Sequence, residues 1–206
     1  MELQQFGWNA VTVGFLGTVL FTVVSAWSLW RQYRRIVARR SGRSVPVMTY
    51  TFRTVAFVAV LIYGLHIGSL ALIFNGSLVV LIQLPILVAL WRYRGFTRRE
   101  RLACLGFLVL LTVMCLFPLK DWFLLAFALG TLGFNALMPY EIWRNRDAGS
   151  VEIRVLLVGL AGNSFWLTYA CAIGDWVLMT VNPAFLTLSL LTTILWFRYR
   201  PRPVAT

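Results

Sequence analysis

Four long apolar blocks separated by short arginine-rich segments dominate this sequence. The blocks cover residues 11–30, 47–90, 102–140 and 155–197, and 60% of the 206 residues are hydrophobic. Charged residues make up 13% of the chain, about half of the fraction that soluble domains carry. The net charge of +12 is confined to the short segments rather than to a polar domain, which argues against nucleic-acid binding. This pattern predicts a protein that crosses a membrane several times.

The lengths of the apolar blocks predict the number of passes. One pass needs about 20 residues, because a helix rises about 1.5 Å per residue and the hydrocarbon layer is about 30 Å thick. The first block is long enough for one pass, and each of the others is long enough for two. We expect the turns between paired passes near Gly68, Lys120 and Gly174. The sequence therefore predicts an all-α membrane protein with seven transmembrane helices.

The basic residues lie almost entirely on one side of these predicted helices. All of them except Lys120 and Arg53 flank the ends of passes one, three, five and seven. The opposite ends carry Glu2, Asp121 and Asp175 beside Lys120. Because cytoplasmic flanks are rich in Lys and Arg, we expect the N-terminus outside and the C-terminus in the cytoplasm. The excess of arginine over lysine is typical of a GC-rich bacterial genome, so we expect a bacterial plasma (inner) membrane.

The two ends of the chain resemble each other, which indicates an internal repeat. Residues 17–31 align with residues 130–144, and residues 44–68 align with residues 150–174. Chance similarity between leucine-rich helices is the alternative. Each repeat has three passes, so a lone fourth helix restores the direction and gives two parallel three-helix repeats (3+1+3). The expected divisions are residues 1–91 for the first repeat, 92–119 for a cytoplasmic loop and linker helix, and 120–206 for the second repeat and a short basic tail.

The second repeat carries the motif residues of a known family. They are Pro139-Tyr140, Gly149-Ser150-Val151, Asn163, Trp166, Tyr169, Gly174-Asp175 and Asn182. This pattern resembles the SWEET and PQ-loop (MtN3-like) transporter superfamily, although the Pro-Gln dipeptide occurs in neither repeat. The first repeat is also similar to the lipid-A-disaccharide-synthase N-terminal-like membrane domain, at residues 42–46, Tyr63-Gly64 and Asn75-Gly76. The resemblance implies a seven-helix transporter of sugar-like solutes.

Asn75 and Asn182 are the first candidates for solute binding. Each lies 7 or 8 residues from an expected outer turn, roughly 10–12 Å deep. An amide at that depth faces either another helix or a water-filled pocket, because its donors and acceptor need partners. The resemblance implies that the pair contacts substrate, as it does in sugar-carrying members of the family. Hydrogen bonding between helices is the alternative.

Aromatic residues beside an amide indicate a further part of the same site. Asn163, Trp166 and Tyr169 share one face of the sixth predicted pass, and Tyr63 is the repeat partner of Tyr169. Such a wall suits a polyol or a sugar ring, which has apolar CH faces and hydroxyl edges. Packing of aromatic side chains within the bundle is the alternative.

Arg53 is the only full charge inside a predicted pass, away from the turns between passes. It lies about 10 Å from the cytoplasmic end of the second pass. If it faces a cavity, the solute carries a carboxylate or a phosphate; the alternative is that its side chain extends to the membrane surface. Pro139 matches the hinge proline of the family, so we expect a hinge there.

Several residue types that other functions require are missing from the sequence. No carboxylate lies in the middle of a predicted pass, which favours uncoupled movement of solute. One histidine, three scattered cysteines and no glycine-rich phosphate loop argue against an enzyme, a metal site or a cofactor. We therefore predict a transporter that moves a small polar solute by alternating access, its oligomeric state left open. The alternative is an accessory or lipid-headgroup-binding protein, with anionic lipid at Arg39, Arg40 and Arg43.

Overall fold

The computed structural model describes residues 2, 6–40, 47–148, 151 and 153–199, without the side chain of Arg39. Within these ranges the chain forms seven α-helices and no strand, which confirms the predicted all-α fold class. The helices are α1 (Ala10–Arg39), α2 (Val47–Ile67), α3 (Leu70–Arg94), α4 (Arg98–Leu116), α5 (Lys120–Asn145), α6 (Ile153–Ile173) and α7 (Trp176–Arg198). Arg43, Gly149 and Ser150 lie outside the described residues, as does the side chain of Arg39.

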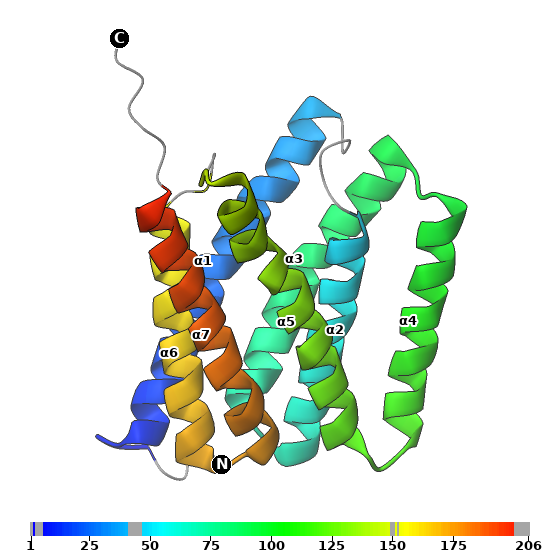
Figure 1. Cartoon of the computed structure of the whole chain (residues 1–206). Helices are drawn as coiled ribbons and strands as arrows, with labels where there is room; N and C mark the ends of the chain where they lie inside the picture. The colour runs from blue at the N-terminus through cyan, green and yellow to red at the C-terminus, as the bar shows by residue number, and fades with distance from the viewer. Residues whose placement is uncertain (1, 3–5, 41–46, 149–150, 152, 200–206) are drawn as a thin grey trace.

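Six of these seven helices are long and apolar enough to cross a membrane. The exception is α4, whose first four residues, 98–101, are all charged. The uncharged remainder, residues 102–116, extends about 22 Å, less than the thickness of the hydrocarbon layer. This helix stands beside α2 and α5 at the edge of the bundle and runs along the same direction as the other helices (Figure 1).

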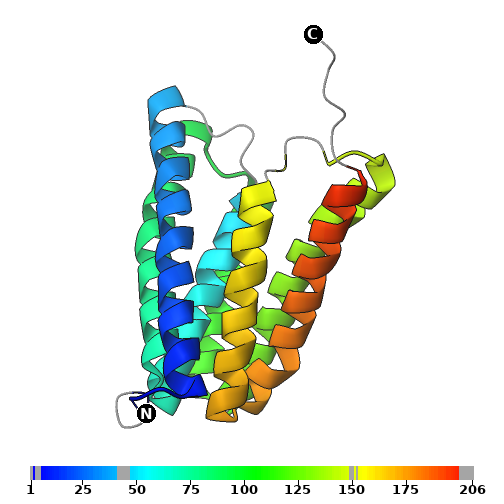
Figure 2. The same cartoon turned by 90° about the vertical axis from the view of Figure 1, so that its left-hand side faces the viewer.

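The remaining helices form two groups of three, which we call the first half (α1–α3) and the second half (α5–α7). In the first half α3 packs against both α1 and α2, and in the second half α7 packs against both α5 and α6. Between the halves α1 packs against α6 and α2 against α5. Figure 2 shows α1 and α6 side by side along this boundary. If α1, α2 and α3 are exchanged with α5, α6 and α7 in that order, the same pairs of helices are in contact.

Tight turns at one end of the bundle join the last two helices of each half. Gly68 and Gly174 occupy these turns with φ of +70° and +68°, a left-handed conformation that glycine adopts without strain. The next residue in each turn caps the following helix: Ser69 Oγ accepts from Leu72 N at 3.2 Å, and Asp175 Oδ1 accepts from Leu178 N at 2.8 Å. We call this the acidic end, because Glu2, Asp121 and Asp175 lie there, and the opposite end the arginine-rich end.

Small residues bring the two halves close together near the acidic end. A Cβ atom added at Gly14 of α1 would lie 2.8 Å from the backbone of Tyr169 in α6. One at Gly17 would overlap the ring of Phe165. One turn further along α1, Phe21 stacks on the same ring with centroids 5.5 Å apart. Close backbone approach of this kind is how helices associate in a membrane, where apolar surface gains nothing by leaving lipid.

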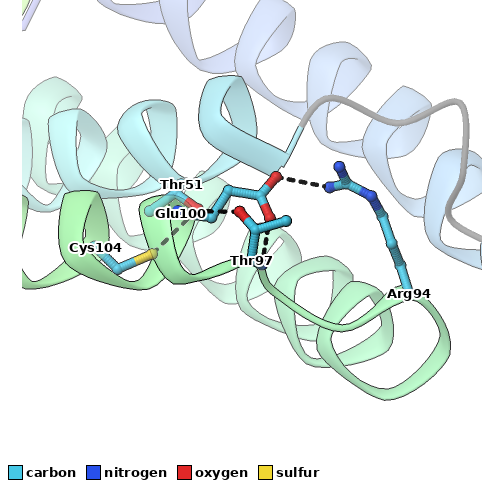
Figure 3. A network of polar contacts seen from close by, with 5 residues as sticks. All are labelled: Thr51, Arg94, Thr97, Glu100 and Cys104. Carbon is cyan, nitrogen blue, oxygen red and sulfur yellow. Dashed lines mark hydrogen bonds and ion pairs between the residues drawn. The ribbon is translucent and has the colours of Figure 1, made fainter.

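A network of polar contacts fixes the start of α4 at the arginine-rich end (Figure 3). Thr97 Oγ1 accepts from Glu100 N at 3.3 Å, and Thr97 N donates to Glu100 Oε2 at 2.8 Å, which forms a capping box. Arg94 pairs with Glu100 at 3.0 Å. The backbone N–H of Thr97, with its hydroxyl and Arg94, holds the pKa of Glu100 below its ordinary value. Cys104 then contacts Thr51 of α2 at 3.8 Å, so α4 is attached to the first half.

Candidate solute-binding site

A cavity of about 310 Å³ lies between the two halves. Every helix except α4 contributes to its wall. Its volume falls in the range of about 300–1,000 Å³ that small-molecule sites occupy. The polar and charged residues in the wall are Thr22, Ser25, Arg53, Asn75, Thr131, Asn135, Asn163 and Asn182. No aspartate or glutamate of the described ranges lines this cavity. The wall thus offers amides, hydroxyls and one cation against an apolar background.

Five of the seven residues predicted to bind solute line this cavity. They are Arg53, Asn75, Asn163, Trp166 and Asn182. These residues come from both halves, so the fold brings together side chains that lie far apart in the sequence. The amides predicted to face a common pocket do so, on equivalent helices α3 and α7.

The two asparagines differ in their hydrogen bonding. Both are 7% exposed. Asn75 Nδ2 donates to Thr22 Oγ1 of α1 at 2.7 Å, so this amide is held within its own half. Asn182 Nδ2 is buried and has no acceptor among the described residues. A buried amide donor without a partner costs about 1–3 kcal/mol, which a solute oxygen would offset.

Asn163 and Trp166 form another part of the wall. Asn163 Nδ2 donates to Ser189 Oγ of α7 at 2.6 Å, which fixes the amide between two helices of the second half. The Trp166 ring lies edge-to-face with Tyr169, with centroids 6.0 Å apart. Trp166 therefore presents an oriented aromatic surface to the cavity, suited to the CH face of a ring-shaped solute.

Arg53, for which the sequence left two alternatives open, lies on the wall of this cavity. Its side chain is solvent-exposed although it lies on the cavity wall between the helices. The guanidinium lies over the ring of Phe57, 5.6 Å from the centroid. No carboxylate of the described ranges forms an ion pair with it. The guanidinium therefore rests on a ring that also lines the cavity.

Tyr63 and Tyr169, also predicted to bind solute, do not line the cavity. They are 2% and 0% exposed, and they lie between the cavity and the acidic end. Tyr63 donates its hydroxyl proton to Asp175 Oδ2 at 2.6 Å. The Tyr169 hydroxyl is hydrogen-bonded to Ser69 Oγ at 2.6 Å and also contacts the Glu2 carboxylate. Each tyrosine thus bonds to the cap residue of the opposite half and closes the bundle at this end.

Toward the arginine-rich end a second cavity of about 300 Å³ continues from the first. The two share Asn135, Gly159 and Phe185 in their walls. The second one extends to Thr49 at the start of α2 and Thr192 near the end of α7, close to the arginine-rich end. The second cavity therefore adjoins the first on the side of the arginine-rich end, and the contacts of Tyr63 and Tyr169 lie on the side of the acidic end.

Pro139, the predicted hinge, is buried inside α5 beside this second cavity. Its neighbour Met138 lines that cavity. One turn earlier along α5, Asn135 lines both cavities. The sequence analysis missed Asn135 and its counterpart Thr22. A signal was available, since each lies five residues after an aligned glycine, Gly130 or Gly17.

Of the three arginines expected to hold anionic lipid, only the side chain of Arg40 is described. It is exposed and follows the last turn of α1, with a left-handed φ of +44°. The binding of anionic lipid stays a prediction, because Arg43 and the Arg39 side chain lie outside the described residues.

Comparison with known proteins agrees with this architecture. The model of a family described as "sugar efflux transporter for intercellular exchange" (MtN3_slv) matches residues 131–204. The solved structure of a eukaryotic SWEET transporter superposes with a TM-score of 0.78 at 17% sequence identity, covering 92% of this chain and 96% of that one. No curated protein sequence matches. The predicted resemblance to SWEET proteins is thus confirmed in the fold and in the second half, and both matches are to transporters rather than to enzymes.

Proposed function

We propose that this chain is a membrane transporter that moves a small polar solute, with sugars as the leading class. One observation carries the proposal: a solute-sized cavity, lined by amides and an aromatic ring, lies between two helical halves and is closed at one end only. A wall that offers hydrogen-bond donors, acceptors and an aromatic face suits the hydroxyls and CH faces of a sugar. The match of the second half to a sugar-transporter family supports the same solute class.

The transport mechanism is alternating access. The halves are parallel three-helix repeats, residues 1–91 and 120–206, joined by a linker in residues 92–119. Equal turns at Gly68 and Gly174 and the exchangeable contacts between the halves support this division. Breaking the Tyr63–Asp175 and Tyr169–Ser69 bonds opens the acidic end, while the halves approach each other at the arginine-rich end. Solute at the level of the asparagines then meets each side of the membrane in turn.

Movement through this cavity is uncoupled. Carriers driven by protons or cations place a carboxylate at membrane depth, where it binds the coupling ion. The described residues of the cavity wall are neutral or cationic. Solute therefore moves down its own gradient, in either direction.

The arginine-rich end faces the cytoplasm, and the acidic end faces outward. Lys and Arg are retained on the cytoplasmic side of membrane proteins, and they flank one end of nearly every helix here. The present conformation is then open to the cytoplasm and closed to the outside, in a bacterial inner membrane.

The test is uptake by proteoliposomes that contain the full-length chain. A screen of labelled sugars, amino acids and nucleosides first identifies the transported solute. Asn182→Ala should then reduce its uptake about tenfold or more, because the unpartnered amide loses its hydrogen bonds to solute. Asn145→Ala is the matched control, since Asn145 is exposed at the arginine-rich end, outside the cavity.

Two outcomes would contradict the proposal. Normal uptake by a correctly inserted Asn182→Ala variant would refute the position of the site. Failure of the wild-type chain to move any soluble compound, with anionic lipid retained on purification, would instead favour the lipid-binding alternative.

A further inference from the structure

We infer that the solute of this cavity carries a negative charge, a carboxylate or a phosphate group on a polyol or sugar ring, and that Arg53 binds that group. The inference rests on the proposed transport function and narrows its solute class. It is carried by an unpaired cation, an unpartnered amide and open space in one cavity.

The first observation is that the charge of Arg53 lacks a counter-ion. Its guanidinium rests on the Phe57 ring, 5.6 Å from the ring centroid. An unpaired cation inside a membrane protein is costly, and it persists where it faces water or a charged ligand. The described wall of the cavity contains no carboxylate that could neutralise it. An anionic solute would supply the missing partner.

The second observation is that the buried polar atom left without a partner in the wall is a donor. Asn182 Nδ2 is buried and unpartnered, whereas Asn75 Nδ2 and Asn163 Nδ2 are bound within the protein. Together with the guanidinium of Arg53, the site therefore presents donors that need acceptors. A ring with hydroxyls and one carboxylate or phosphate provides these acceptors, and the planar guanidinium can hold two oxygens of the anion at once.

The spacing along the helices fits such a solute. Arg53 lies about 21 Å from the end of α2 at the turn, and Asn182 lies about 9 Å from the corresponding end of α7. Measured along the helix axes, the two backbone positions are therefore offset by about 12 Å, and the long Arg53 side chain, which rests on Phe57 one turn closer to that end, spans part of this offset. The cavity of about 310 Å³ that both residues line is large enough for one sugar ring.

The third observation is the space at Gly159, the position in α6 that corresponds to Arg53 in α2. A Cβ atom added at Gly159 would meet no atom within 4 Å, so the cavity is open there. Gly159 also lines the passage toward the arginine-rich end. The two halves therefore contribute one cation and one empty space at this level, which suits a solute with a single charged group.

The inference is tested with four ligands that share one ring. Glucose is neutral. Glucuronate carries a carboxylate at carbon 6, and glucuronamide is the neutral isostere of glucuronate. Glucose 6-phosphate carries a phosphate at the same carbon. The full-length wild-type protein should take up glucuronate or glucose 6-phosphate about tenfold or more faster than the two neutral compounds, at equal low concentration. Preference for one of the anions identifies the carboxylate or the phosphate as the recognised group.

Variants at Arg53 connect that preference to the residue. Arg53→Gln should reduce uptake of the preferred anion about tenfold or more and remove the preference for that anion over its neutral counterpart. Arg53→Lys should retain part of the preference, because it keeps the charge without the planar fork. Arg144→Gln is the matched control: it removes the same charge from an exposed position outside the cavity.

The outcomes separate this inference from the proposed function. Uptake of a neutral solute, with glucuronate no better than glucuronamide and glucose 6-phosphate no better than glucose, overturns the inference and leaves the transporter in place. That comparison needs only the wild-type chain, so it decides even if Arg53→Gln does not fold. Anion preference that survives Arg53→Gln overturns the role of Arg53. Absence of uptake for every ligand, here and in the broader screen, overturns both proposals.

Discussion

The first and second halves of the molecule are alike in the contacts at the acidic end and unlike in the wall of the cavity. At the acidic end, the tyrosine of each middle helix bonds to the cap residue of the other half: Tyr63 to Asp175, and Tyr169 to Ser69. The same interval in sequence separates the two tyrosines and the two cap residues, so one contact becomes the other when the halves are exchanged. Closing this end needs matching surfaces from both halves.

In the middle of the bundle the corresponding positions carry different chemistry. Arg53 of α2 corresponds to Gly159 of α6, and Val60 corresponds to Trp166. Asn75 is bonded within its half, whereas Asn182 is not. A solute has no two-fold symmetry, so a cavity formed by two similar halves becomes selective only where their side chains diverge. In the proposed transport cycle, conformational change and solute recognition would therefore depend on separate sets of residues.

The largest effect is expected from filling the space that only the second half leaves open. Gly159→Leu adds a side chain to the wall of the cavity that Arg53 also lines, and its Cβ would meet no atom within 4 Å. Uptake should fall about 10- to 100-fold through overlap with solute, while the protein still inserts. Gly106→Leu is the control, since Gly106 is equally unobstructed but lies on α4, away from the cavity. Equal loss in both variants would mean that the effect is not specific to the cavity.

The next effect concerns the contacts that the halves share. Tyr63→Phe and Tyr169→Phe each remove one hydroxyl that reaches the opposite half, and each hydroxyl contacts one carboxylate. Each should raise the ratio of outward-open to outward-closed protein about 3- to 20-fold, since hydrogen bonds between membrane helices contribute about 0.6–1.7 kcal/mol.

This shift is measured in the background of Val60→Cys. The quantity compared is the rate at which an impermeant thiol reagent, added outside, labels the new cysteine. The three native cysteines, Cys104, Cys115 and Cys171, are first replaced by alanine. If labelling becomes faster in one tyrosine variant and keeps the wild-type rate in the other, the two closing contacts are not equivalent.

A smaller effect is expected at Pro139, whose counterpart in the first half is Ala26. Pro139 cannot donate a backbone hydrogen bond to the carbonyl of Asn135, one turn earlier, and this weakens α5 beside the passage between the cavities. Pro139→Ala restores that bond and should lower the turnover rate about 2- to 5-fold with little change in solute affinity. Ala26→Gly is the comparison in the first half. A larger loss of turnover there than at Pro139 would refute a hinge confined to the second half.

The smallest effect is expected at the helix that joins the halves. Thr97→Ala removes the side-chain cap of α4 and should lower the free energy of unfolding by about 1 kcal/mol, measured by thermal denaturation in detergent, with uptake unchanged.

Glu100 in the same network should make stability depend on pH. Because folding lowers the pKa of Glu100, its contribution to the free energy of unfolding is present above the unfolded carboxyl value of about 4.3 and is lost as the pH falls through the folded-state pKa. Glu100→Gln should therefore be less sensitive to acid than the wild type. Equal acid sensitivity would exclude this network as its source.

The seven helices, their turns and most of the candidate site were predictable from the sequence. Runs of apolar residues long enough for a bilayer leave few other folds, because the backbone must bond to itself in lipid. Glycine followed by a capping residue, at Gly68-Ser69 and Gly174-Asp175, located both tight turns. The internal alignment also paired Asn75 with Asn182. Equivalent positions in two parallel groups of helices can approach the same axis, and both residues line one cavity.

Other properties depended on how the helices pack. Arg53 lies on the cavity wall, and periodicity could not predict this, because a largely apolar helix has no distinct polar face to mark the direction of a long side chain. Tyr63 and Tyr169 resemble wall residues by position, yet they seal the acidic end, since their partners come from turns of the opposite half. Hydropathy depends on each segment alone and therefore determined the helices and their number; the cavity and its closure arise from contacts between segments about a hundred residues apart, which only the tertiary structure brings together.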